Sequence, residues 1–254
     1  MEKVSIITAV KNRAVTIADT LNSLYGQTHR DVEHIVIDGG STDGTLSILE
    51  RHRNRISKLI SEPDQGLYDA LNKGIRAASG DVIGILHADD VYADEWVLND
   101  VLRSLQDTGA DTCYGDLVYV ARTDPGKVVR YWRAKEPDRD RFLWGWMPPH
   151  PTFFVGRFLY EQYGFFNTEL GSAADYELLL RFLYRHKVSS AYIPRVLVRM
   201  RTGGISNASL GSRLHAHRMD RLAWKVNGLT AYPWTLLLKP LRKLPQFAMR
   251  PTRG

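Results

Sequence analysis

The chain has 254 residues, which is enough for one large α/β domain or two small ones. Its 44% hydrophobic and 24% charged residues are ordinary for a soluble globular protein. The single cysteine, Cys113, excludes an intramolecular disulfide and fits a reducing compartment. No apolar run approaches the roughly 20 residues that span a bilayer. Residues 1–3 lead directly into a strand pattern, so we expect no signal peptide and a cytoplasmic location.

The net charge of +6 is concentrated in the C-terminal part of the chain. From Arg195 onward, 12 Lys and Arg residues face a single acidic residue, Asp220, which gives this segment a balance of +11. The preceding residues carry 22 basic against 27 acidic side chains. Nucleic-acid binding needs basic residues across a folded face, so we expect no nucleic-acid partner. A basic C-terminal tail suits an anionic surface instead.

The first half of the chain alternates predicted strands and helices. Apolar runs predict strands over residues 4–10, 32–37, 57–60 and 81–86, and helical spacing of apolar residues follows the first three of them. This alternation predicts a mostly parallel sheet with helices on both faces. In such a sheet the loops after the carboxyl ends of the strands share one edge, where ligands bind.

Polar side chains occupy four of these loops, at residues 8–13, 38–43, 62–65 and 87–90. The fourth loop ends in two adjacent carboxylates, Asp89 and Asp90. Hard cations such as Mg²⁺ or Mn²⁺ take carboxylate and phosphate oxygens as ligands, so this pair predicts a metal site. The residues alone leave a second interpretation open, in which Asp90 only caps the next helix.

Three motifs resemble those of family 2 glycosyltransferases. Residues 35–45 (IVIDGGSTDGT) resemble the nucleotide-binding loop of this family, and residues 62–75 (EPDQGLYDALNKGI) resemble its next signature. Residues 88–90 (ADD) resemble its metal-binding DXD-type motif. Order and spacing also match, so the resemblance covers about residues 3–205. It implies an α/β protein with the GT-A fold that binds a nucleotide-sugar.

The resemblance also implies roles for individual residues. Asp89 and Asp90 would hold the donor diphosphate through Mn²⁺ or Mg²⁺. The chain departs from the family at His87, where many relatives have Asp, and at Leu71, where many have Arg. The role of His87 and one cationic phosphate contact therefore stay open. Four residues would border or bind the nucleoside: Thr8, Ala9, Asp38 and Asp64.

The pattern changes in the second half of the chain. After a helix that carries Trp96 and Leu105, antiparallel strands are expected around a hairpin turn at residues 124–126. We expect one domain over residues 1–208, in which residues 1–112 bind the nucleotide-sugar and residues 113–208 form the acceptor side. Two tryptophans, Trp144 and Trp146, are candidates for the walls of a sugar pocket or for the core.

Four further residues have candidate roles in this half. His150 stands where similar enzymes place a residue near the donor diphosphate, and a core histidine is the alternative. Asp175 begins a helix predicted over residues 174–184 and resembles the acidic motif that supplies the catalytic base of inverting family members. A cap is the alternative for Asp175, and Glu177 is a second candidate base. Arg201 would supply positive charge beside residues 203–206, which resemble a loop that closes over donor phosphates.

Residues 209–254 are predicted to form a helix followed by a basic tail. Residues 232–247 are aromatic, leucine-rich and basic, which is typical of a segment that lies on an anionic membrane surface. A disordered basic tail is the alternative.

The whole sequence predicts an inverting, metal-dependent glycosyltransferase, peripheral on the inner face of the cell membrane. It would move a sugar from a nucleotide-sugar, preferably a UDP-sugar, to a hydroxyl acceptor. That acceptor would be a glycan or a lipid-linked oligosaccharide of cell-surface polysaccharide synthesis. Two other functions stay open: a nucleotide-sugar-binding protein with a degenerate catalytic site, and a nucleotidyltransferase.

Overall fold

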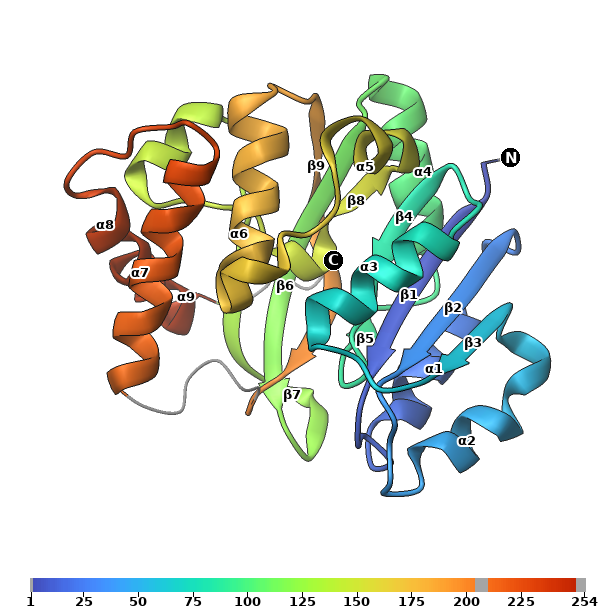
Figure 1. Cartoon of the computed structure of the whole chain (residues 1–254). Coiled ribbons are helices and arrows are strands. Elements are labelled where there is room, and N and C mark those ends of the chain that lie inside the picture. The colour runs from blue at the N-terminus through green and yellow to red at the C-terminus, as the bar shows by residue number, and fades with distance from the viewer. Residues whose placement is uncertain (1, 204–209, 250–254) are drawn as a thin grey trace.

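The computed structural model describes residues 2–203 and 210–249, with side chains described outside residues 210–214. A nine-stranded sheet runs through the described part (Figure 1), in the order β3-β2-β1-β4-β8-β6-β9-β5, with β7 paired to β6. The strands are β1 (Val4–Val10), β2 (Val32–Asp38), β3 (Lys58–Ser61), β4 (Val82–Ile85), β5 (Val91–Tyr92), β6 (Thr112–Ala121), β7 (Asp124–Trp132), β8 (Phe154–Gly156) and β9 (Ser190–Arg201).

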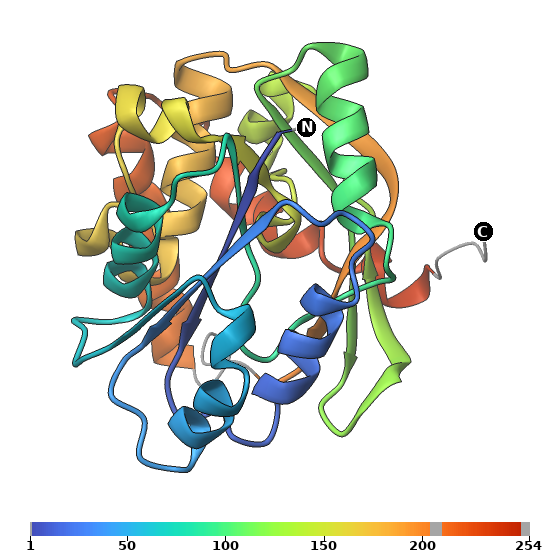
Figure 2. The same ribbon diagram turned by 90° about the vertical axis from the view of Figure 1, so that its right-hand side faces the viewer.

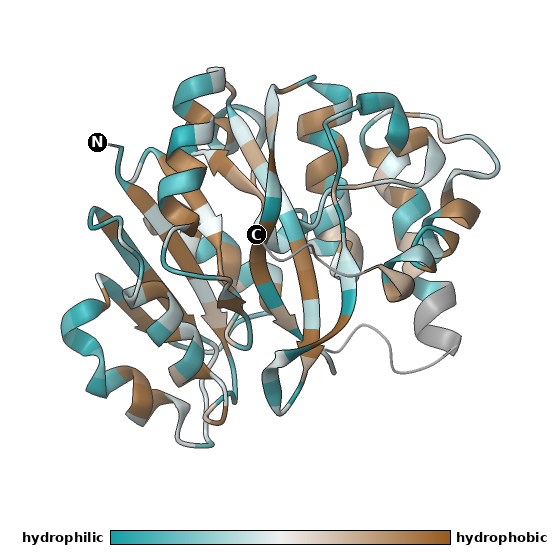
Figure 3. Cartoon of the chain, turned by 180° about the vertical axis from the view of Figure 1, so that it is seen from behind, coloured by the Kyte–Doolittle hydropathy of each residue, from teal (hydrophilic) through white to brown (hydrophobic). Residues whose placement is uncertain are grey.

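Helices cover both faces of the sheet (Figure 2). The core on one face joins the sheet to α3, α5, α6 and α7, and the cores on the other face join it to α1, α2 and α4. Apolar residues accordingly line the strands along their length (Figure 3). The helices are α1 (Ile17–Tyr25), α2 (Thr45–Arg51), α3 (Leu67–Ala77), α4 (Val97–Thr108), α5 (Arg157–Tyr163), α6 (Ala174–Leu179), α7 (Leu210–Val226), α8 (Thr235–Leu241) and α9 (Pro245–Ala248).

The N-terminal half is the predicted parallel sheet. Strand β1 pairs in parallel with β2 and β4, and β2 pairs in parallel with β3. Every residue of β1 is buried, because a central parallel strand is covered by helices on both faces. The carboxyl ends of β1, β2 and β4 therefore lie at one edge and place their loops side by side.

The second half contains the expected antiparallel strands, with one correction. Strand β7 begins at Asp124, which pairs with Ala121, so the turn lies at residues 122–123 and the prediction of a turn at 124–126 is wrong. Pro125 is tolerated inside β7 because this strand pairs only with β6 and needs no second ladder of hydrogen bonds. Strands β5 and β8 were not predicted, since two and three residues show no usable periodicity.

The C-terminal helices pack on the same core. Trp224 of α7 is buried, and its indole N–H donates to the Tyr176 hydroxyl at 2.9 Å. Thr235 of α8 donates to the carbonyl oxygen of Leu143 at 2.5 Å. The described part of the C-terminal segment is thus ordered against the domain, which contradicts the alternative of a disordered tail. The domain boundary predicted at residues 208–209 falls outside the described residues.

None of the helices within residues 2–203 and 210–249 is both long enough and apolar enough to cross a membrane.

Candidate active site

Loops from three strands meet at the carboxyl edge of the sheet. The backbone N–H of Asn12, after β1, donates to the Ser41 hydroxyl at 2.9 Å, and the Asn12 side chain accepts from the N–H of Thr42 at 2.9 Å. Arg13 forms an ion pair with Asp89, with Nε and Oδ2 3.8 Å apart. The loops after β1, β2 and β4 are therefore one continuous surface.

Asp38 ends β2 and is fully buried. Its carboxylate accepts hydrogen bonds from the hydroxyl of Ser41 at 2.5 Å and from the hydroxyl of Ser61 at 2.7 Å. Asp64 lies next to it, where one oxygen accepts from the N–H of Gly66 at 2.9 Å. A Cβ atom at Gly39 would approach the other oxygen of Asp64 to 2.3 Å, so Asp64 leans over the Asp38 loop.

The structure places Thr8 and Ala9 inside the sheet. Both are buried, and the Thr8 hydroxyl lies 3.1 Å from Nε2 of His34 on β2. The Thr8 side chain is thus a packing contact between β1 and β2, and the expectation that Thr8 and Ala9 border the nucleoside stays a prediction.

Hydrogen bonds from two distant elements fix the backbone of residues 88–90. The hydroxyls of Thr16 and Thr20, at the start of α1, donate to the carbonyl oxygens of Ala88 at 3.0 Å and Asp90 at 2.8 Å. Arg201, at the end of β9, donates from Nη1 to the carbonyl oxygen of Asp89 at 3.0 Å and pairs with Asp19. Arg201 is only 6% exposed, so it holds this turn rather than standing free beside it. Residues 204–206 of the adjoining predicted loop lie outside the described residues.

The carboxylate of Asp90 is buried and has no partner. Asp90 is 1% exposed, and neither of its oxygens forms a hydrogen bond. Burial raises the pKa of Asp90 well above its ordinary value, and the charge of Asp89 raises it further against the opposing effect of Arg201. A buried carboxylate without a partner is costly, and a bound cation removes that cost.

The donor set fits a divalent cation that is shared with a substrate. Within residues 2–203 and 210–249, no group of three or more His, Cys, Asp or Glu side chains could hold a metal ion. Mg²⁺ is commonly bound through one or two carboxylates together with substrate phosphates. Asp89 and Asp90 supply two such carboxylates, and Asp89 is half-buried beside Arg13.

Asp175 and His150 form a pair opposite this turn. Oδ2 of Asp175 lies 2.9 Å from Nδ1 of His150, close enough for an ion pair but without hydrogen-bond geometry. The His150 ring stands edge-on to that of His87, with centroids 6.2 Å apart. Burial by itself would raise the pKa of Asp175, but His150, Lys239 and the N–H of Tyr176 outweigh it and lower this pKa to about 2. Asp175 is therefore ionised at neutral pH.

Two further side chains, Tyr68 and Lys239, lie close to Asp175. Burial and the nearby Asp175 carboxylate raise the pKa of Tyr68 well above its ordinary value, which keeps its hydroxyl protonated. Lys239 reaches the site from α8, with Nζ 3.5 Å from the centroid of the Tyr176 ring. The sequence leaves Tyr68, inside the motif at residues 62–75, either to pack or to line the site, whereas no sequence signal connects a tail lysine with Asp175.

The remaining candidates have structural roles. Glu177 is buried, and its carboxylate is held by two hydrogen bonds of 2.9 Å from Arg181. Trp146 is buried, with its indole N–H bonded to the carbonyl oxygen of Ala134 at 2.8 Å, whereas Trp144 lies on the surface at 48% exposure. The proposed pair of sugar-stacking tryptophans is therefore wrong for Trp146.

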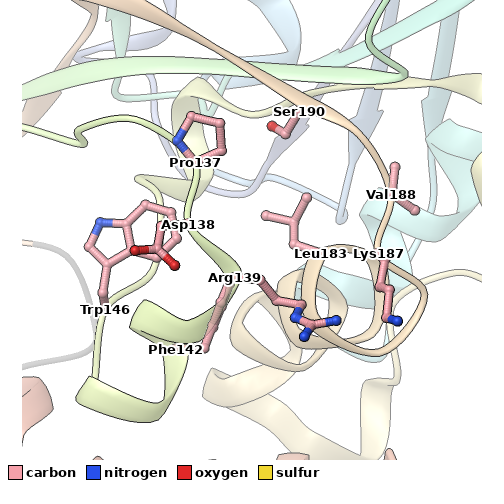
Figure 4. A pocket seen from close by; sticks show the side chains of 9 residues that line it. All are labelled: Pro137, Asp138, Arg139, Phe142, Trp146, Leu183, Lys187, Val188 and Ser190. Carbon is pink, nitrogen blue, oxygen red and sulfur yellow. The ribbon is translucent and has the colours of Figure 1, made fainter.

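A pocket at the opposite end of the sheet is separate from this site (Figure 4). It lies where β9 begins, and of the candidate residues only the buried Trp146 lines it. Its lining residues are Pro137, Asp138, Arg139, Phe142, Trp146, Leu183, Lys187, Val188 and Ser190.

Comparison with known proteins decides the family. Residues 5–166 match the family described as Glycosyl transferase family 2. The chain belongs to this family. An uncharacterized glycosyltransferase of Mycobacterium tuberculosis is 33% identical over 184 residues, which are 70% of this chain and 68% of that protein. A PGL/p-HBAD biosynthesis glycosyltransferase of Mycobacterium bovis is 28% identical over 208 residues, which cover 80% of this chain and 78% of that protein. The predicted glycosyltransferase identity is confirmed.

Two solved structures share the fold of this chain. Residues 1–349 of S. aureus TarS, in complex with UDP-GlcNAc, align with a TM-score of 0.73 at 22% identity over 90% of this chain and 67% of that chain. The chain spans 39% of a longer TarS structure. The mannosyltransferase PcManGT of Pyrobaculum calidifontis, in complex with GDP-Man and Mn²⁺, aligns with a TM-score of 0.65 at 19% identity, over 97% and 73% of the two chains. The predicted GT-A fold is confirmed.

Proposed function

We propose that this family 2 glycosyltransferase is an inverting, metal-dependent enzyme. It would transfer a sugar from a nucleotide-sugar, preferably a UDP-sugar, to a hydroxyl of a lipid-linked oligosaccharide in cell-surface polysaccharide synthesis. The observation that carries the proposal is the buried, unpartnered carboxylate of Asp90, at the sheet edge that also carries Asp38 and Asp64. The complexes of TarS with UDP-GlcNAc and of PcManGT with GDP-Man and Mn²⁺ support it by analogy.

The donor would bind across the loops after β1, β2 and β4. Asp38 and Asp64 would face the nucleoside, with Asp38 acting mainly through the loop that it orders. Asp89 and Asp90 would hold Mn²⁺ or Mg²⁺, which when bound neutralises the negative charge that develops on a departing diphosphate. Arg201 would keep the two carboxylates in place through the Asp89 carbonyl oxygen.

Asp175 would act as the general base. Its ionised carboxylate takes the proton of the acceptor hydroxyl while that oxygen attacks the anomeric carbon and the bond to the diphosphate oxygen breaks. Attack from the side opposite the leaving group inverts the configuration at that carbon. His150 would keep the carboxylate ionised and oriented from 2.9 Å away.

Peripheral membrane association is part of the proposal. Three aromatic side chains, Trp144, Tyr232 and Trp234, form an exposed cluster, with the rings of Tyr232 and Trp234 stacked 5.0 Å apart. Aromatic and aliphatic side chains of this kind insert at the interface of a membrane, and basic residues beside them favour anionic lipids. Exposed aliphatic residues continue the cluster along α8 at Leu237 and Leu241.

A donor screen with one variant tests the proposal. Thermal shift with UDP-, GDP- and dTDP-sugars, with and without Mn²⁺, should show Mn²⁺-dependent stabilisation by one donor, which grows with RT ln(1 + [L]/Kd). Asp175→Asn should keep this stabilisation and lose turnover by at least about 100-fold. The anomeric configuration of the product, read by NMR, checks inversion. Unchanged turnover in Asp175→Asn would exclude the assigned base, and no stabilisation by any donor would count against the whole proposal.

A further inference from the structure

Three basic side chains from two distant parts of the chain come together, two of them near Asp175. They are Arg130 of β7, Lys239 of α8 and Lys243 in the turn that follows α8. Lys239 and Lys243 are four residues apart along continuing helical turns, so they lie on the same side. Gln246, one turn further, accepts a hydrogen bond from Nε of Arg130 at 2.7 Å, which brings β7 against that side.

The positive charges of this cluster are only partly compensated. Nζ of Lys239 pairs with Asp220 at 2.7 Å, whereas no ion pair joins Lys243 to a carboxylate in the described part of the chain. Nη2 of Arg130 is buried and has no hydrogen-bond partner. Burial lowers the pKa of Lys243, and the charges of Lys239 and Arg130 lower it further against the opposing charges of Asp220 and Asp175. A bound anion would relieve this repulsion.

The cluster lies on the side of the site where the acceptor would enter. Nζ of Lys239 stands 3.5 Å from the centre of the Tyr176 ring, and its charge lowers the pKa of the adjacent Asp175. The outer side of the same helical segment exposes Leu237, Leu241 and Leu244, whereas the ring of the exposed Phe247 lies 5.5 Å from the Arg130 guanidinium. Positive charge next to the base and an apolar strip beside it together suit an amphiphile with an anionic head.

We propose that Arg130, Lys239 and Lys243 form a subsite for the phosphate group of a lipid-linked acceptor, next to an apolar strip for the start of its lipid chain. Guanidinium and ammonium groups are the usual donors to phosphate oxygens in proteins. A phosphate held there would bring the sugar that it carries toward Asp175. This subsite rests on the proposed function, because Asp175 defines the acceptor side only if it is the base.

Binding of geranyl phosphate, without donor and in EDTA, tests the subsite. Isothermal titration should show binding of geranyl phosphate by the wild-type chain and much weaker binding of uncharged geraniol. Lys243→Ala should weaken the affinity for geranyl phosphate about tenfold, and Lys243→Arg should restore most of it. Lys225→Ala is the matched control, since Lys225 is an exposed lysine on α7. Equal affinities of the wild type and Lys243→Ala, or equal binding of geraniol, would overturn the proposal.

Vesicle flotation separates the two sources of a phosphate group. We expect Lys243→Ala to float with phosphatidylcholine vesicles containing phosphatidylglycerol nearly as well as the wild type does. A loss of flotation with unchanged binding of geranyl phosphate would assign the cations to bilayer headgroups and overturn the acceptor subsite. Neither measurement uses a nucleotide-sugar or a metal, so failure of the donor screen would refute the proposed function and leave these results unaffected.

Discussion

Gly39 lies between the side chains of Asp64 and Lys11 and has no room for a methyl group. A Cβ atom there would stand 2.3 Å from Oδ2 of Asp64 and 3.4 Å from Cδ of Lys11. Asp64 cannot yield without losing its hydrogen bond to the N–H of Gly66. The position of one proposed nucleoside ligand therefore depends on the absence of a side chain in the neighbouring loop.

Gly39→Ala should weaken donor binding more than folding. We expect the Kd for the nucleotide-sugar to rise about tenfold, because Asp64 has to rotate away from its place over the loop. The melting temperature without donor should change little, since Asp64 lies at the molecular surface. Gly26→Ala, at the end of α1, is the control, because its Cβ would meet only the Asn22 carbonyl oxygen at 3.2 Å. Equal donor affinities of the two variants would show that Asp64 does not need this position.

At the scale of secondary-structure elements, His34 connects its own strand β2 with β1 and α1. Its Nε2 lies 3.1 Å from the Thr8 hydroxyl of β1, and its Nδ1 lies 3.0 Å from the Tyr25 hydroxyl of α1. Burial lowers the pKa of His34 to about 3, so the ring is neutral in the folded chain. The stability of the packing between β1, β2 and α1 therefore depends on pH.

His34 should make stability fall as the pH drops from about 6.5 to about 3. Between these values the unfolded chain binds a proton at His34 and the folded chain does not, so acid favours unfolding. His34→Gln cannot take up this proton. As the pH drops, the free energy of unfolding of the wild type should therefore fall more steeply than that of His34→Gln, by up to about 1.4 kcal/mol per pH unit. Urea titrations at several pH values measure both slopes. Parallel slopes would show that His34 is already accessible to protons in the folded chain.

The strands of the parallel sheet could be predicted from the sequence, but the contacts between elements could not. Buried parallel strands need long apolar runs, so β1, β2 and β4 and the polar loops after them were visible. The pairing of Asp175 with His150 was not, because spacing along a helix says which residues share a face but not which loop packs on it. The partner of Thr8 was hidden for a similar reason: a position at the end of an apolar run does not reveal that a neighbouring strand supplies a histidine.

At the scale of the whole molecule, the C-terminal helices complete the domain. Helix α7 lies beside α6 and contacts α8 (Figure 1), and Asn227 donates a hydrogen bond at 3.1 Å to Glu177 inside α6. Lys239 of α8 contacts the ring of Tyr176, the residue that follows the proposed base Asp175. A basic, leucine-rich composition fits a segment that lies on a membrane and equally a segment that packs on the domain. Composition does not show that only one side of α8 faces outward.

Two tryptophans of this segment give a matched test. Trp224→Ala should cost about 3–5 kcal/mol of unfolding free energy, because it leaves a cavity next to Tyr184 and removes the hydrogen bond to Tyr176. Trp234→Ala should cost less than about 1 kcal/mol, since Trp234 is 43% exposed and stacks on the surface. Guanidinium unfolding followed by circular dichroism measures both. If the segment were dispensable for the fold, the two variants would unfold at the same denaturant concentration as the wild type. A large loss confined to Trp224→Ala would place α7 in the cooperative core of the enzyme.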